Sequence, residues 1–482
     1  MNTSKESTSP QINRRSFLQS SAIGAGMMVL PSYVVGQSSS QKSPNERLNI
    51  ALVGVAGKGK GPTMACMAEN VVALCDVDMG HVAQSRKTLK AGETTNPFDE
   101  ACKHHEKKGA KWYQDYRKMF EEVGDKIDAV IISIPDFMHY PVAMTAINLG
   151  IHVYCEKPLA HTVDEVRKMQ KAAAKAGVVS QMGNQGHSNS GTRSVKEWLE
   201  AGVIGKVTEV HSWTNRPVGS WTAIHGTAKP KHKNGQAPAV PKGLDWDVWQ
   251  GISKRRAYDP SYLPFSWRGF VDYGCGSLGD MACHIMDSAF WGLNLGSPTE
   301  ISASTTKRTG YTYPKVNKVT YKFPARGKMP ALTYHWYDGL MTPSTPGFLK
   351  GYDPHASKEG QNGSLIVGEG MAIQTTTYSE QIKIVPNEKF MEIRQAKALP
   401  PRTLRRIKGE HLDEFFNAIR ENRKASSDFS YAAPFTETIL LGCIAQRTGR
   451  NMKFDGKNGV FIGDDEANSM LKKNYPKGWI LG

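Results

Sequence analysis

Residues 48–61 restrict the folds open to this chain more than any other segment. A largely apolar run typical of a buried strand, residues 48–53, leads directly into a glycine-rich loop, residues 54–61, and a helical segment follows. A strand, a tight glycine turn and a helix in this order begin an α/β unit. Further β-prone runs that alternate with helical segments lie at residues 71–75, 129–134, 151–154 and 178–182. The sequence therefore predicts a doubly wound parallel sheet in this part of the chain.

The glycine loop has the composition of a dinucleotide-binding loop. Glycines leave the backbone N–H groups at the start of a helix free to bind a pyrophosphate. The predicted phosphate-binding residues are Gly54, Ala56, Gly57, Lys58 and Gly59, with alanine in place of the middle glycine of the usual motif. Asp76 follows the second strand, where a carboxylate accepts hydrogen bonds from the adenosine ribose and repels a 2′-phosphate. We therefore expect NAD as the cofactor, and NADP remains the alternative because of Lys58.

The run Val153–Pro158 predicts that a lysine lies at the ligand-binding edge of this sheet. The run begins with β-prone residues and ends in a carboxylate, an amine and a proline, before a helix that Thr162 caps and Gly177 ends. Ligands of open α/β sheets bind at the carboxyl ends of the strands. Lys157 is therefore a candidate functional group, and a solvated lysine in a surface turn is the alternative.

Asp280 and His284 form a second candidate pair. They are four residues apart, so they share one face of a predicted helix and can both point into a cleft. A histidine or a lysine can accept the proton of an alcohol near neutral pH. The alternative for His284 is a core histidine with satisfied hydrogen bonds. We expect no metal, because few residues have the spacing of zinc ligands.

The second half of the chain has the pattern of an α+β domain. Between Thr214 and Phe270 it is irregular and rich in tryptophan, whose rings either stack on sugars or pack within long loops. Alternating segments at residues 302–307, 318–323 and 331–336 indicate strands, and helices return at residues 410–421 and 434–450. The predicted fold is a Rossmann domain followed by an α+β domain with a large, mostly antiparallel, open-faced sheet.

The length of 482 residues exceeds one ordinary core. We expect a leader and linker at residues 1–46, an NAD-binding domain at 47–183 and a substrate-binding and dimerisation domain at 184–482. The C-terminal helices of the last domain can pack back on the first.

The net charge of +16 reflects 61 lysines and arginines that are dispersed and accompany no nucleic-acid motif. A solvated basic surface is favoured, with an anionic partner or a polysaccharide as the alternative. Seven dispersed cysteines without a CxxC pair predict free, buried thiols.

The N-terminus has the pattern of a twin-arginine export signal. Arg14 and Arg15 precede an uncharged, moderately apolar run at residues 20–35. Glycines and a proline interrupt this run, which is too short to favour a membrane-spanning helix. A linker rich in serine and glutamine follows at residues 37–45. We therefore expect a periplasmic or otherwise exported protein, and the sequence leaves open whether the leader is cleaved.

Taken together, these motifs resemble the Gfo/Idh/MocA oxidoreductases, named for glucose-fructose oxidoreductase and inositol dehydrogenase. The resemblance rests on the loop at 54–59, Asp76, Ile134-Pro135 with His139, Cys155-Glu156-Lys157-Pro158, the glycine-led D-x-x-x-H segment at 274–284 and a strand pair at 363–372. The leader and the segments at 183–187 and 215–217 further resemble the exported branch of that family, which includes NAD-dependent glycosidases. Those glycosidases tend to lack E-K-P, so Lys157 favours the ordinary dehydrogenase pattern.

The resemblance implies roles for individual residues. Lys157, Asp280 and His284 would be catalytic. Beyond the glycine loop and Asp76, the cofactor would be contacted by Ile134, Pro135, His139, Glu156, Lys157 and Asn184, and the substrate by Asn215, Arg216, Trp267 and Arg268. The implied partners are a carbohydrate substrate and further copies of the chain, as a dimer or tetramer, with no nucleic acid and no membrane span in the mature protein.

The expected function is NAD-dependent oxidation of a hydroxyl of a sugar, polyol or glycoside. Free nicotinamide cofactor is scarce outside the cytoplasm, so we expect a tightly bound cofactor that is recycled internally. A redox-neutral NAD-dependent glycosidase or epimerase is one alternative. A non-catalytic sugar-binding protein on the same scaffold is the other.

Overall fold

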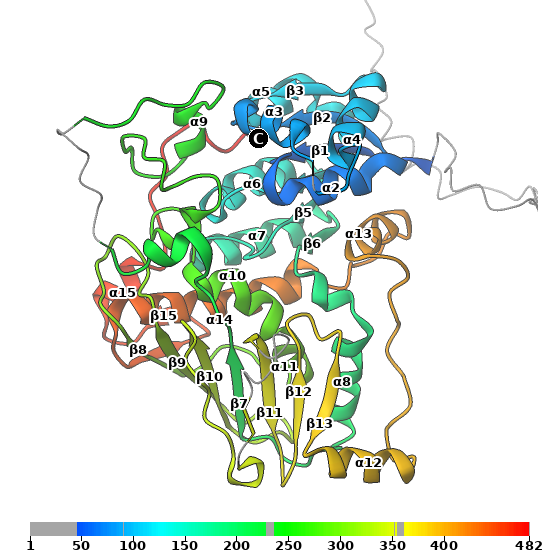
Figure 1. Cartoon of the computed structure of the whole chain (residues 1–482), viewed down its shortest axis with the longest axis vertical. Coiled ribbons are helices and arrows are strands. Elements are labelled where there is room, and N and C mark those ends of the chain that lie inside the picture. The colour runs from blue at the N-terminus through cyan, green and yellow to red at the C-terminus, as the bar shows by residue number, and fades with distance from the viewer. Residues whose placement is uncertain (1–45, 90, 228–235, 351, 354–360, 482) are drawn as a thin grey trace, which may run out of the picture. The chain divides into compact units, whose positions relative to one another are not determined.

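The computed structural model describes residues 46–89, 91–227, 236–350, 352–353 and 361–481 (Figure 1). The predicted export leader, with Arg14 and Arg15, lies outside the described residues. Among the helices that the structure describes, none is long and apolar enough to cross a membrane.

Six parallel strands form the first sheet, in the order β3-β2-β1-β4-β5-β6. The strands are β1 (Asn49–Val53), β2 (Asn70–Cys75), β3 (Lys111–Tyr113), β4 (Ala129–Ile132), β5 (His152–Cys155) and β6 (Ser180–Met182). The helices between or after them are α2 (Lys60–Ala65), α3 (Met79–Lys87), α4 (Pro97–Lys107), α5 (Tyr116–Val123), α6 (His139–Asn148) and α7 (Val163–Ala176). This arrangement confirms the predicted Rossmann-like sheet, although the three-residue strand β3 was not predicted.

Local signals set the ends of two helices in this region. The side chain of Thr162 caps α7 in a capping box with Glu165, and Gly177 ends the helix in the left-handed conformation, at φ 66°. The helix α4 begins where the Asn96 side chain accepts hydrogen bonds from the backbone of the first turn. The segment between β2 and β3 therefore holds two helices, α3 and α4.

Nine strands form the second sheet, in the order β13-β12-β11-β7-β10-β9-β8-β14-β15. They are β7 (Glu209–Trp213), β8 (Glu300–Thr305), β9 (Asn317–Phe323), β10 (Leu332–Asp338), β11 (Gly363–Val367), β12 (Ala372–Thr375), β13 (Ile382–Val385), β14 (Met452–Asp455) and β15 (Val460–Phe461). The pair β7 and β10 runs parallel, and the other pairs of this sheet run antiparallel. The mostly antiparallel second sheet is confirmed.

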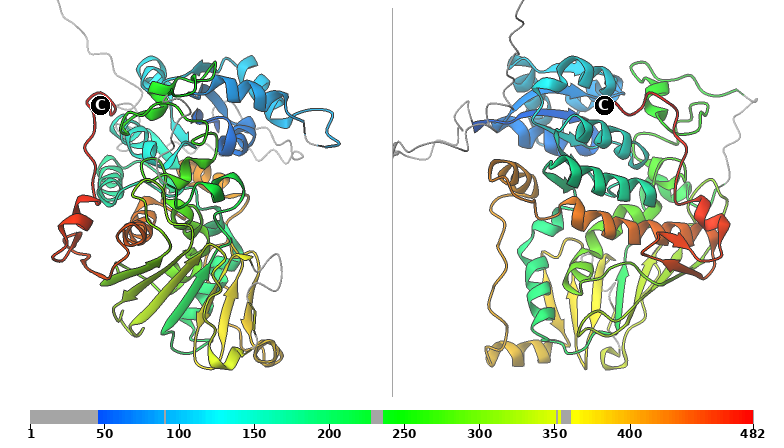
Figure 2. Two further views of the ribbon diagram at one scale, coloured as in Figure 1. Left: turned by 60° about the vertical axis from the view of Figure 1, so that its left-hand side comes forward. Right: turned by 180° about the vertical axis from the view of Figure 1, so that it is seen from behind.

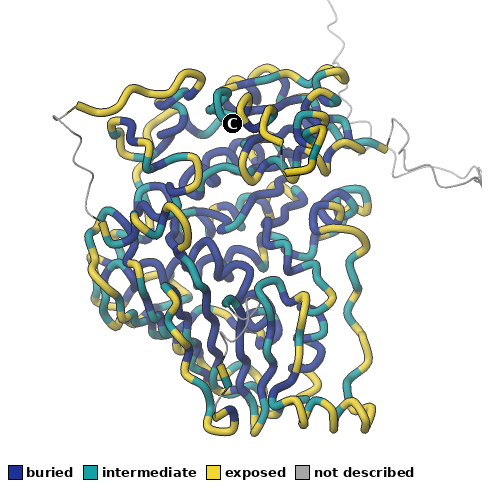
Figure 3. Tube along the Cα trace, viewed as in Figure 1, coloured by how far each residue is buried: buried dark blue, intermediate teal, exposed yellow. Residues whose placement is uncertain are grey.

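Side chains alternate between the two faces of the second sheet. Along β9, Val319 and Tyr321 are buried, whereas Lys318, Thr320 and Lys322 on the other face are partly or fully exposed. Figure 3 shows the buried residues gathered along the sheets and the helices between them. One face of the sheet is therefore covered and the other is more open.

The remaining helices are α8 (Ser190–Glu200), α9 (Trp246–Gln250), α10 (Gly276–Ile285), α11 (Asp287–Gly292), α12 (Asn387–Gln395), α13 (His411–Arg420), α14 (Phe429–Thr448) and α15 (Asp465–Ser469). Helix α14 runs between α7 and the second sheet (Figures 1 and 2). Arg167 of α7 and Glu437 of α14 form an ion pair at 2.6 Å. Helix α13 packs on the first sheet, where Phe415 joins the core cluster of Ile50 and Leu52. All seven cysteines are buried and free, as predicted.

Candidate active site

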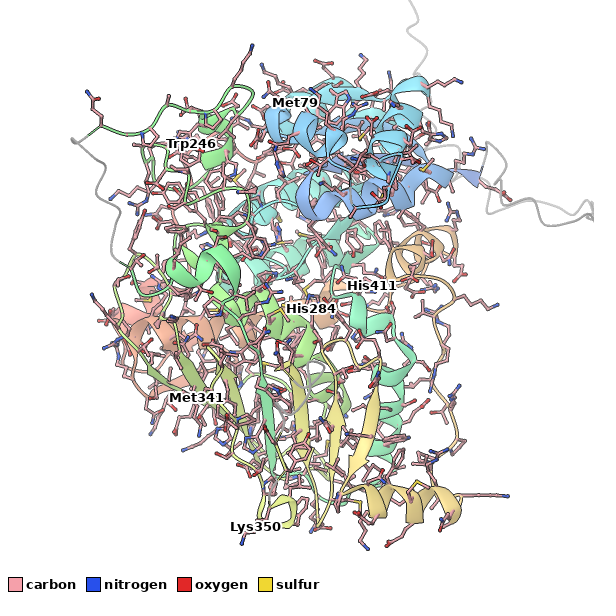
Figure 4. The ribbon with its side chains drawn as sticks, viewed as in Figure 1. Met79, Trp246, His284, Met341, Lys350 and His411 are labelled. Carbon is pink, nitrogen blue, oxygen red and sulfur yellow. The ribbon has the colours of Figure 1, made fainter. Side chains whose placement is uncertain are left out.

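A cavity of about 620 Å³ lies at the carboxyl ends of β1, β2, β4 and β5. This volume is in the usual range for small-molecule sites, roughly 300–1,000 Å³. The first sheet forms one wall, and α10 with residues 263–268 forms another. Figure 4 places His284 between the helices of the first sheet and the strands of the second. The cavity therefore lies where the two parts of the fold meet.

The glycine loop closes one end of the cavity and leaves no room for side chains at two positions. A Cβ atom on Gly54, which has φ +82°, would lie 2.4 Å from the Ser133 carbonyl oxygen. A Cβ on Gly59 would lie 1.8 Å from the Gly54 carbonyl oxygen. Gly57 has φ +58° and faces open space. The loop thus has a backbone surface that a phosphate can approach closely.

Asp76 at the end of β2 holds the glycine loop in place. Its Oδ2 accepts hydrogen bonds from the backbone N–H of Val55 at 2.9 Å and of Ala56 at 3.0 Å. Its Oδ1 accepts from Asp78 N–H at 3.0 Å. Asp76 also lines the cavity, so its carboxylate can still accept a hydrogen bond from a ribose hydroxyl.

The lining of the cavity suits a dinucleotide. Besides the glycine backbone, Lys58 and Lys60 supply positive charge beside the loop, and Ile134 and Pro135 supply apolar surface at the end of β4. Backbone N–H groups and lysines suit a pyrophosphate, the Asp76 carboxylate suits a ribose, and apolar side chains suit a planar ring. The residues present therefore fit NAD.

Glu156 and Lys58 link the loop to the end of β5. The Lys58 ammonium lies 3.5 Å from Glu156 Oε1, which also accepts a hydrogen bond from Gln185 Nε2 at 3.1 Å. A Cβ on Gly183 would lie 2.7 Å from the Glu156 carboxyl carbon, so glycine is required beside this carboxylate. Glu156 and Lys58, both predicted to contact the cofactor, line the cavity.

Lys157 is held by Asp280. Its Nζ donates hydrogen bonds to Asp280 Oδ1 at 2.8 Å and to the Asp280 backbone carbonyl at 2.6 Å. Arg268 Nε donates to the same Oδ1 at 3.2 Å, and Arg216 Nη1 lies 4.0 Å from Oδ2. These four side chains all line the cavity. The structure thus brings two predicted catalytic residues and two predicted substrate residues into one cluster.

The charges in this cluster set its protonation state. Burial raises the pKa of Asp280, but Lys157, Arg268 and Arg216 outweigh burial and hold that pKa well below its usual range. Burial lowers the pKa of Lys157, but the Asp280 carboxylate outweighs it, so the net shift is upward. Near neutral pH, Lys157 is therefore an ammonium that donates hydrogen bonds, and Asp280 is a carboxylate.

His284 lies one helical turn beyond Asp280 and also lines the cavity. Burial and the nearby Lys157 hold its pKa well below the usual value, so the imidazole is neutral near pH 7. Its Nδ1 is buried and has no hydrogen-bond partner in the part of the chain that the structure describes. The ring meets that of Tyr378 edge-on, with the centroids 4.7 Å apart. A neutral imidazole beside a fixed ammonium is able to accept a proton.

The sequence reasoning missed Asp136. This buried carboxylate lines the cavity and accepts a hydrogen bond from Cys275 N–H at 3.0 Å. Burial raises its pKa to about 7, against the lowering effect of Arg268 and Lys157. The sequence did contain a signal for Asp136, because this residue directly follows Ile134 and Pro135 at the same sheet edge as Lys157. Gln185 and Tyr378 were also missed. Gln185 lies in the segment at 183–187 that the resemblance includes, whereas no sequence motif marks Tyr378.

Four of the predicted contact residues do not line the cavity. His139 is fully buried, and its Nδ1 and Nε2 each lie 2.8 Å from a carbonyl oxygen, of Pro158 and Ile134 respectively. Asn184 is fully buried, and its Oδ1 accepts a hydrogen bond from Ser427 Oγ at 2.6 Å. Asn215 Nδ2 donates to Gln361 Oε1 at 2.8 Å. Gly59 is buried at the end of the glycine loop.

None of these four residues is among those that line the cavity. His139 connects the end of β4 to the segment after Lys157, so its side chain holds these two parts of the site together. Trp267 does line the cavity, and the Arg268 guanidinium stacks 4.1 Å from a Trp267 ring centroid.

A short segment, residues 241–249, binds the chain that follows β2 and reaches the cavity wall at Val248 and Trp249; we call it the strap. The Gly243 carbonyl oxygen accepts hydrogen bonds from Met79 N–H at 2.9 Å and Gln114 Nε2 at 3.1 Å. Asp245 N–H donates to the Val77 carbonyl at 2.9 Å. Two strap residues, Val248 and Trp249, line the cavity opposite the first sheet. In Figure 4, Trp246 lies at the same end of the described region as Met79.

Two family models match the chain. One, described as the oxidoreductase family with an NAD-binding Rossmann fold, matches residues 48–184. The other, described as the C-terminal alpha/beta domain of an oxidoreductase family, matches residues 190–329 and 402–481. The matches thus include the glycine loop, Lys157, Asp280 and His284.

Curated relatives match over shorter segments. Levoglucosan dehydrogenase of Pseudarthrobacter phenanthrenivorans is 26% identical over 36% of this chain and 35% of its own. Inositol 2-dehydrogenase of Rubrobacter xylanophilus is 25% identical over 39% of this chain and 51% of its own. The chain therefore spans about half or less of the length of these relatives.

Solved structures show the same fold over most of the chain. Aldose-aldose oxidoreductase from Caulobacter crescentus, complexed with glycerol, has a TM-score of 0.52 and 15% identity, covering 85% of this chain and 100% of that chain. The WlbA dehydrogenase from Bordetella pertussis, in complex with NADH and UDP-GlcNAcA, has a TM-score of 0.52 and 15% identity, covering 85% and 99%.

Proposed function

Because the chain belongs to the Gfo/Idh/MocA family of NAD-binding oxidoreductases, we propose that it oxidises a hydroxyl of a sugar, polyol or glycoside with a cofactor that it retains. The family assigns an oxidoreductase with NAD as its cofactor, which agrees with the prediction from the glycine loop and Asp76. The names of the relatives, among them levoglucosan dehydrogenase and inositol 2-dehydrogenase, support a carbohydrate or polyol substrate.

One observation carries the proposal. Lys157, Asp280 and His284, from β5's end and from α10, line the same cavity as the glycine loop. A hydroxyl that binds there lies between a hydrogen-bond donor and a neutral base. Arg216 and Arg268, which surround Asp280, add donors for neighbouring hydroxyl oxygens.

Bound NAD supplies the acceptor for the hydride that leaves the carbinol carbon. The neutral imidazole of His284 accepts the hydroxyl proton. The Lys157 ammonium donates a hydrogen bond to the oxygen as negative charge develops on it, and Asp280 keeps Lys157 charged and in position. The substrate leaves as the carbonyl compound, and the proton remains on His284 until it exchanges with water.

The strap supports retention of the cofactor. It is tied to the start of α3 by backbone hydrogen bonds, from Met79 N–H to Gly243 O and from Asp245 N–H to Val77 O. Its Trp249 ring packs against Tyr273, with the centroids 4.9 Å apart, so both ends of the strap are fixed. A ligand beneath such a segment leaves only when these contacts break, which slows dissociation.

Asp136 favours a redox-neutral glycosidase or epimerase as the second candidate. Elimination or epimerisation next to an oxidised carbon requires a second group that exchanges a proton. Asp136 lines the cavity and has a pKa raised to about 7, where a carboxyl group can both accept and donate a proton. A retained cofactor suits this reaction as well, because reduction in the last step restores NAD.

Three further expectations are part of the proposal. The twin-arginine pair Arg14-Arg15 supports export of the folded protein. The more open face of the second sheet, with Lys318 and Thr320, supports a dimer or tetramer. The domain boundaries at 183 and 184 remain a prediction.

Product analysis distinguishes the candidates. The natively purified chain is incubated with a panel of sugars, polyols and glycosides, and the products are identified by mass spectrometry. A carbonyl product supports net oxidation, and a hydrolysed or epimerised product supports the redox-neutral reaction. Binding of a sugar without any product, in protein that contains NAD, would contradict both and leave the sugar-binding alternative.

A further inference from the structure

A second cavity, of about 370 Å³, lies behind the active site. It is enclosed by the C-terminal part of α14, the segment after α15, residues 252–254 and the start of α7. Its volume fits a small organic molecule and exceeds what a single water or metal ion needs. The reaction proposed above uses none of its residues.

Cationic side chains outnumber carboxylates in the lining of this cavity. Four of them are Lys254, Arg447, Lys472 and Lys473. The carboxylate among the lining residues is Asp272, whose Oδ2 accepts a hydrogen bond from Arg256 Nε at 2.8 Å. The positive charge of the cavity therefore exceeds the negative charge that its own lining provides.

Within the described part of the chain, three of these cationic side chains form no hydrogen bond or ion pair with another residue. They are those of Arg447, Lys254 and Lys472. Unpaired cations on an open surface are ordinary, because water solvates them. Lys254 and Lys472 are exposed in this way, whereas Arg447 and Lys473 are only partly exposed and line the same concavity. The Arg447 charge disfavours the nearby Lys473 ammonium, and an anion bound between the two would relieve this repulsion.

A contact with His161 holds the Lys473 ammonium beside the cavity. The His161 Nε2–H donates to the Gly274 carbonyl at 2.9 Å, so its Nδ1 is the acceptor for the Lys473 ammonium. Burial lowers the pKa of Lys473, although Glu165 opposes this effect. Glu165 is itself occupied, since it accepts hydrogen bonds from Thr162 N–H at 2.7 Å and Tyr475 Oη at 2.5 Å.

We propose that this cavity is a second ligand site, which binds a small molecule through a phosphate, sulfate or carboxylate group held between Arg447 and Lys473. Arginine binds such oxyanions with two parallel hydrogen bonds, and the lysine adds a point charge. The cavity is larger than the oxyanion, so the rest of the ligand lies against the apolar side chains of Ile252, Leu440 and Ile444.

The second site shares a wall with the active site. On one side of this wall, the Gly274 carbonyl accepts from His161; on the other, Cys275 N–H donates to Asp136 Oδ2 at 3.0 Å. His161 also follows the chain segment that carries Lys157. A ligand in the second cavity therefore lies against His161, whose ring binds the Gly274 carbonyl just before α10, and this connection makes the ligand a candidate effector.

The test measures binding by calorimetry to the full chain loaded with NAD, so that the glycine loop is occupied. The probes are inorganic phosphate, inorganic sulfate, a hexose phosphate and a hexuronate. Saturable binding of at least one probe is expected. Tighter binding of the hexose phosphate or the hexuronate would assign an organic ligand, and equal binding of inorganic phosphate would assign the free ion. The absence of saturable binding of all four probes would overturn the proposal.

Variants locate the binding. Arg447→Gln and Lys473→Gln should each weaken it by about tenfold or more, because a charge-assisted hydrogen bond is lost. Arg447→Lys should retain part of the affinity. This result would show that the glutamine variants lose binding because they lose a charge and not because they misfold. Lys87→Gln, which removes an exposed charge elsewhere, is the matched control and should bind normally. Binding that survives Arg447→Gln and Lys473→Gln but is lost in Lys58→Gln would place the anion at the glycine loop and contradict the second site.

Discussion

Lys157 Nζ donates two hydrogen bonds to one residue, reaching Asp280 Oδ1 at 2.8 Å and the Asp280 backbone carbonyl at 2.6 Å. The two residues come from different parts of the fold, the end of β5 and the middle of α10. The hydrogen bond to the helix backbone fixes the direction of the Lys157 side chain, and the Asp280 carboxylate keeps its amine protonated. This contact joins the NAD-binding part of the chain to the part that holds the substrate candidates.

Replacing Lys157 with methionine should abolish turnover and preserve cofactor binding. Methionine keeps the length of the side chain but removes the ammonium, and loss of a positioned acid or base costs about a hundredfold to ten-thousandfold in rate. The glycine loop and Asp76 are unchanged, so retained NAD should remain within about twofold of the wild type. Turnover and NAD content are measured on the same preparation.

Lys168→Met is the matched control for this prediction. Lys168 forms an exposed ion pair with Asp164 on α7, far from the chemistry, and such pairs contribute little to stability. It should keep normal turnover. Wild-type turnover in Lys157→Met would show that the ammonium is not required and would shift attention to Asp136 and the loop residues.

Asp136 should make the protein less stable as the pH rises. Its pKa in the folded state, about 7, lies above the value of about 3.9 expected for an unfolded chain. The folded state therefore binds the proton more tightly, so this contribution is complete below about pH 4 and is lost as the pH rises through 7. The loss is at most about 4 kcal/mol in the free energy of unfolding.

Asp136→Asn isolates this contribution, because the amide oxygen can still accept the Cys275 N–H but does not titrate. Asp338, with a pKa also raised to about 7 by burial, changes stability in the same direction and remains in both proteins. The difference between wild type and variant, from denaturant unfolding at several pH values, is the relevant quantity. Parallel stability curves from pH 4 to 8 would show that Asp136 does not have the raised pKa.

Gly80→Ala should loosen the strap and release the cofactor. A Cβ at this position would lie 2.6 Å from the Lys242 carbonyl oxygen, so the strap must move away. Alanine is otherwise favourable within α3, so the helix itself should persist. The fraction of protein that retains NAD after gel filtration should fall several-fold.

Gly296→Ala provides the comparison, since a Cβ there meets nothing within 4 Å. It should retain NAD as the wild type does. If Gly80→Ala retains NAD equally well, the strap does not control release of the cofactor.

The fold followed from local signals that were strong in the sequence. The capping box of Thr162 and Glu165 and the left-handed Gly177 set α7, and the steric demands at Gly54 and Gly59 explain why the loop is rich in glycine. The strand β3 was missed because three residues carry too little periodicity to detect.

The site was predictable where a motif fixes both the position and the direction of a side chain. Lys157 and Asp280 are such residues, and both line the cavity, although their direct contact was not predicted. His139 and Asn184 occupy suitable places in the chain, but their side chains turn toward Pro158 and Ser427, which sequence spacing does not specify. Tyr378 reaches His284 from the second sheet, through tertiary packing that no local pattern records.

Export is tested separately from the chemistry. Replacing Arg14 and Arg15 with lysine should leave the full chain in the cytoplasm, folded and loaded with NAD, because the twin-arginine route requires the arginine pair. Cell fractionation checks this outcome. Normal export of the double variant would contradict the twin-arginine assignment without affecting the active-site proposal.

The most direct test is a single turnover on natively purified protein without added cofactor. Mass spectrometry of the denatured sample quantifies the retained NAD, and the absorbance band of reduced nicotinamide is followed after a sugar, polyol or glycoside is added. We predict that each folded chain retains NAD and that a substrate reduces it in the wild type but not in Lys157→Met. Protein that holds no NAD, and that binds neither added NAD nor NADP, would contradict the account.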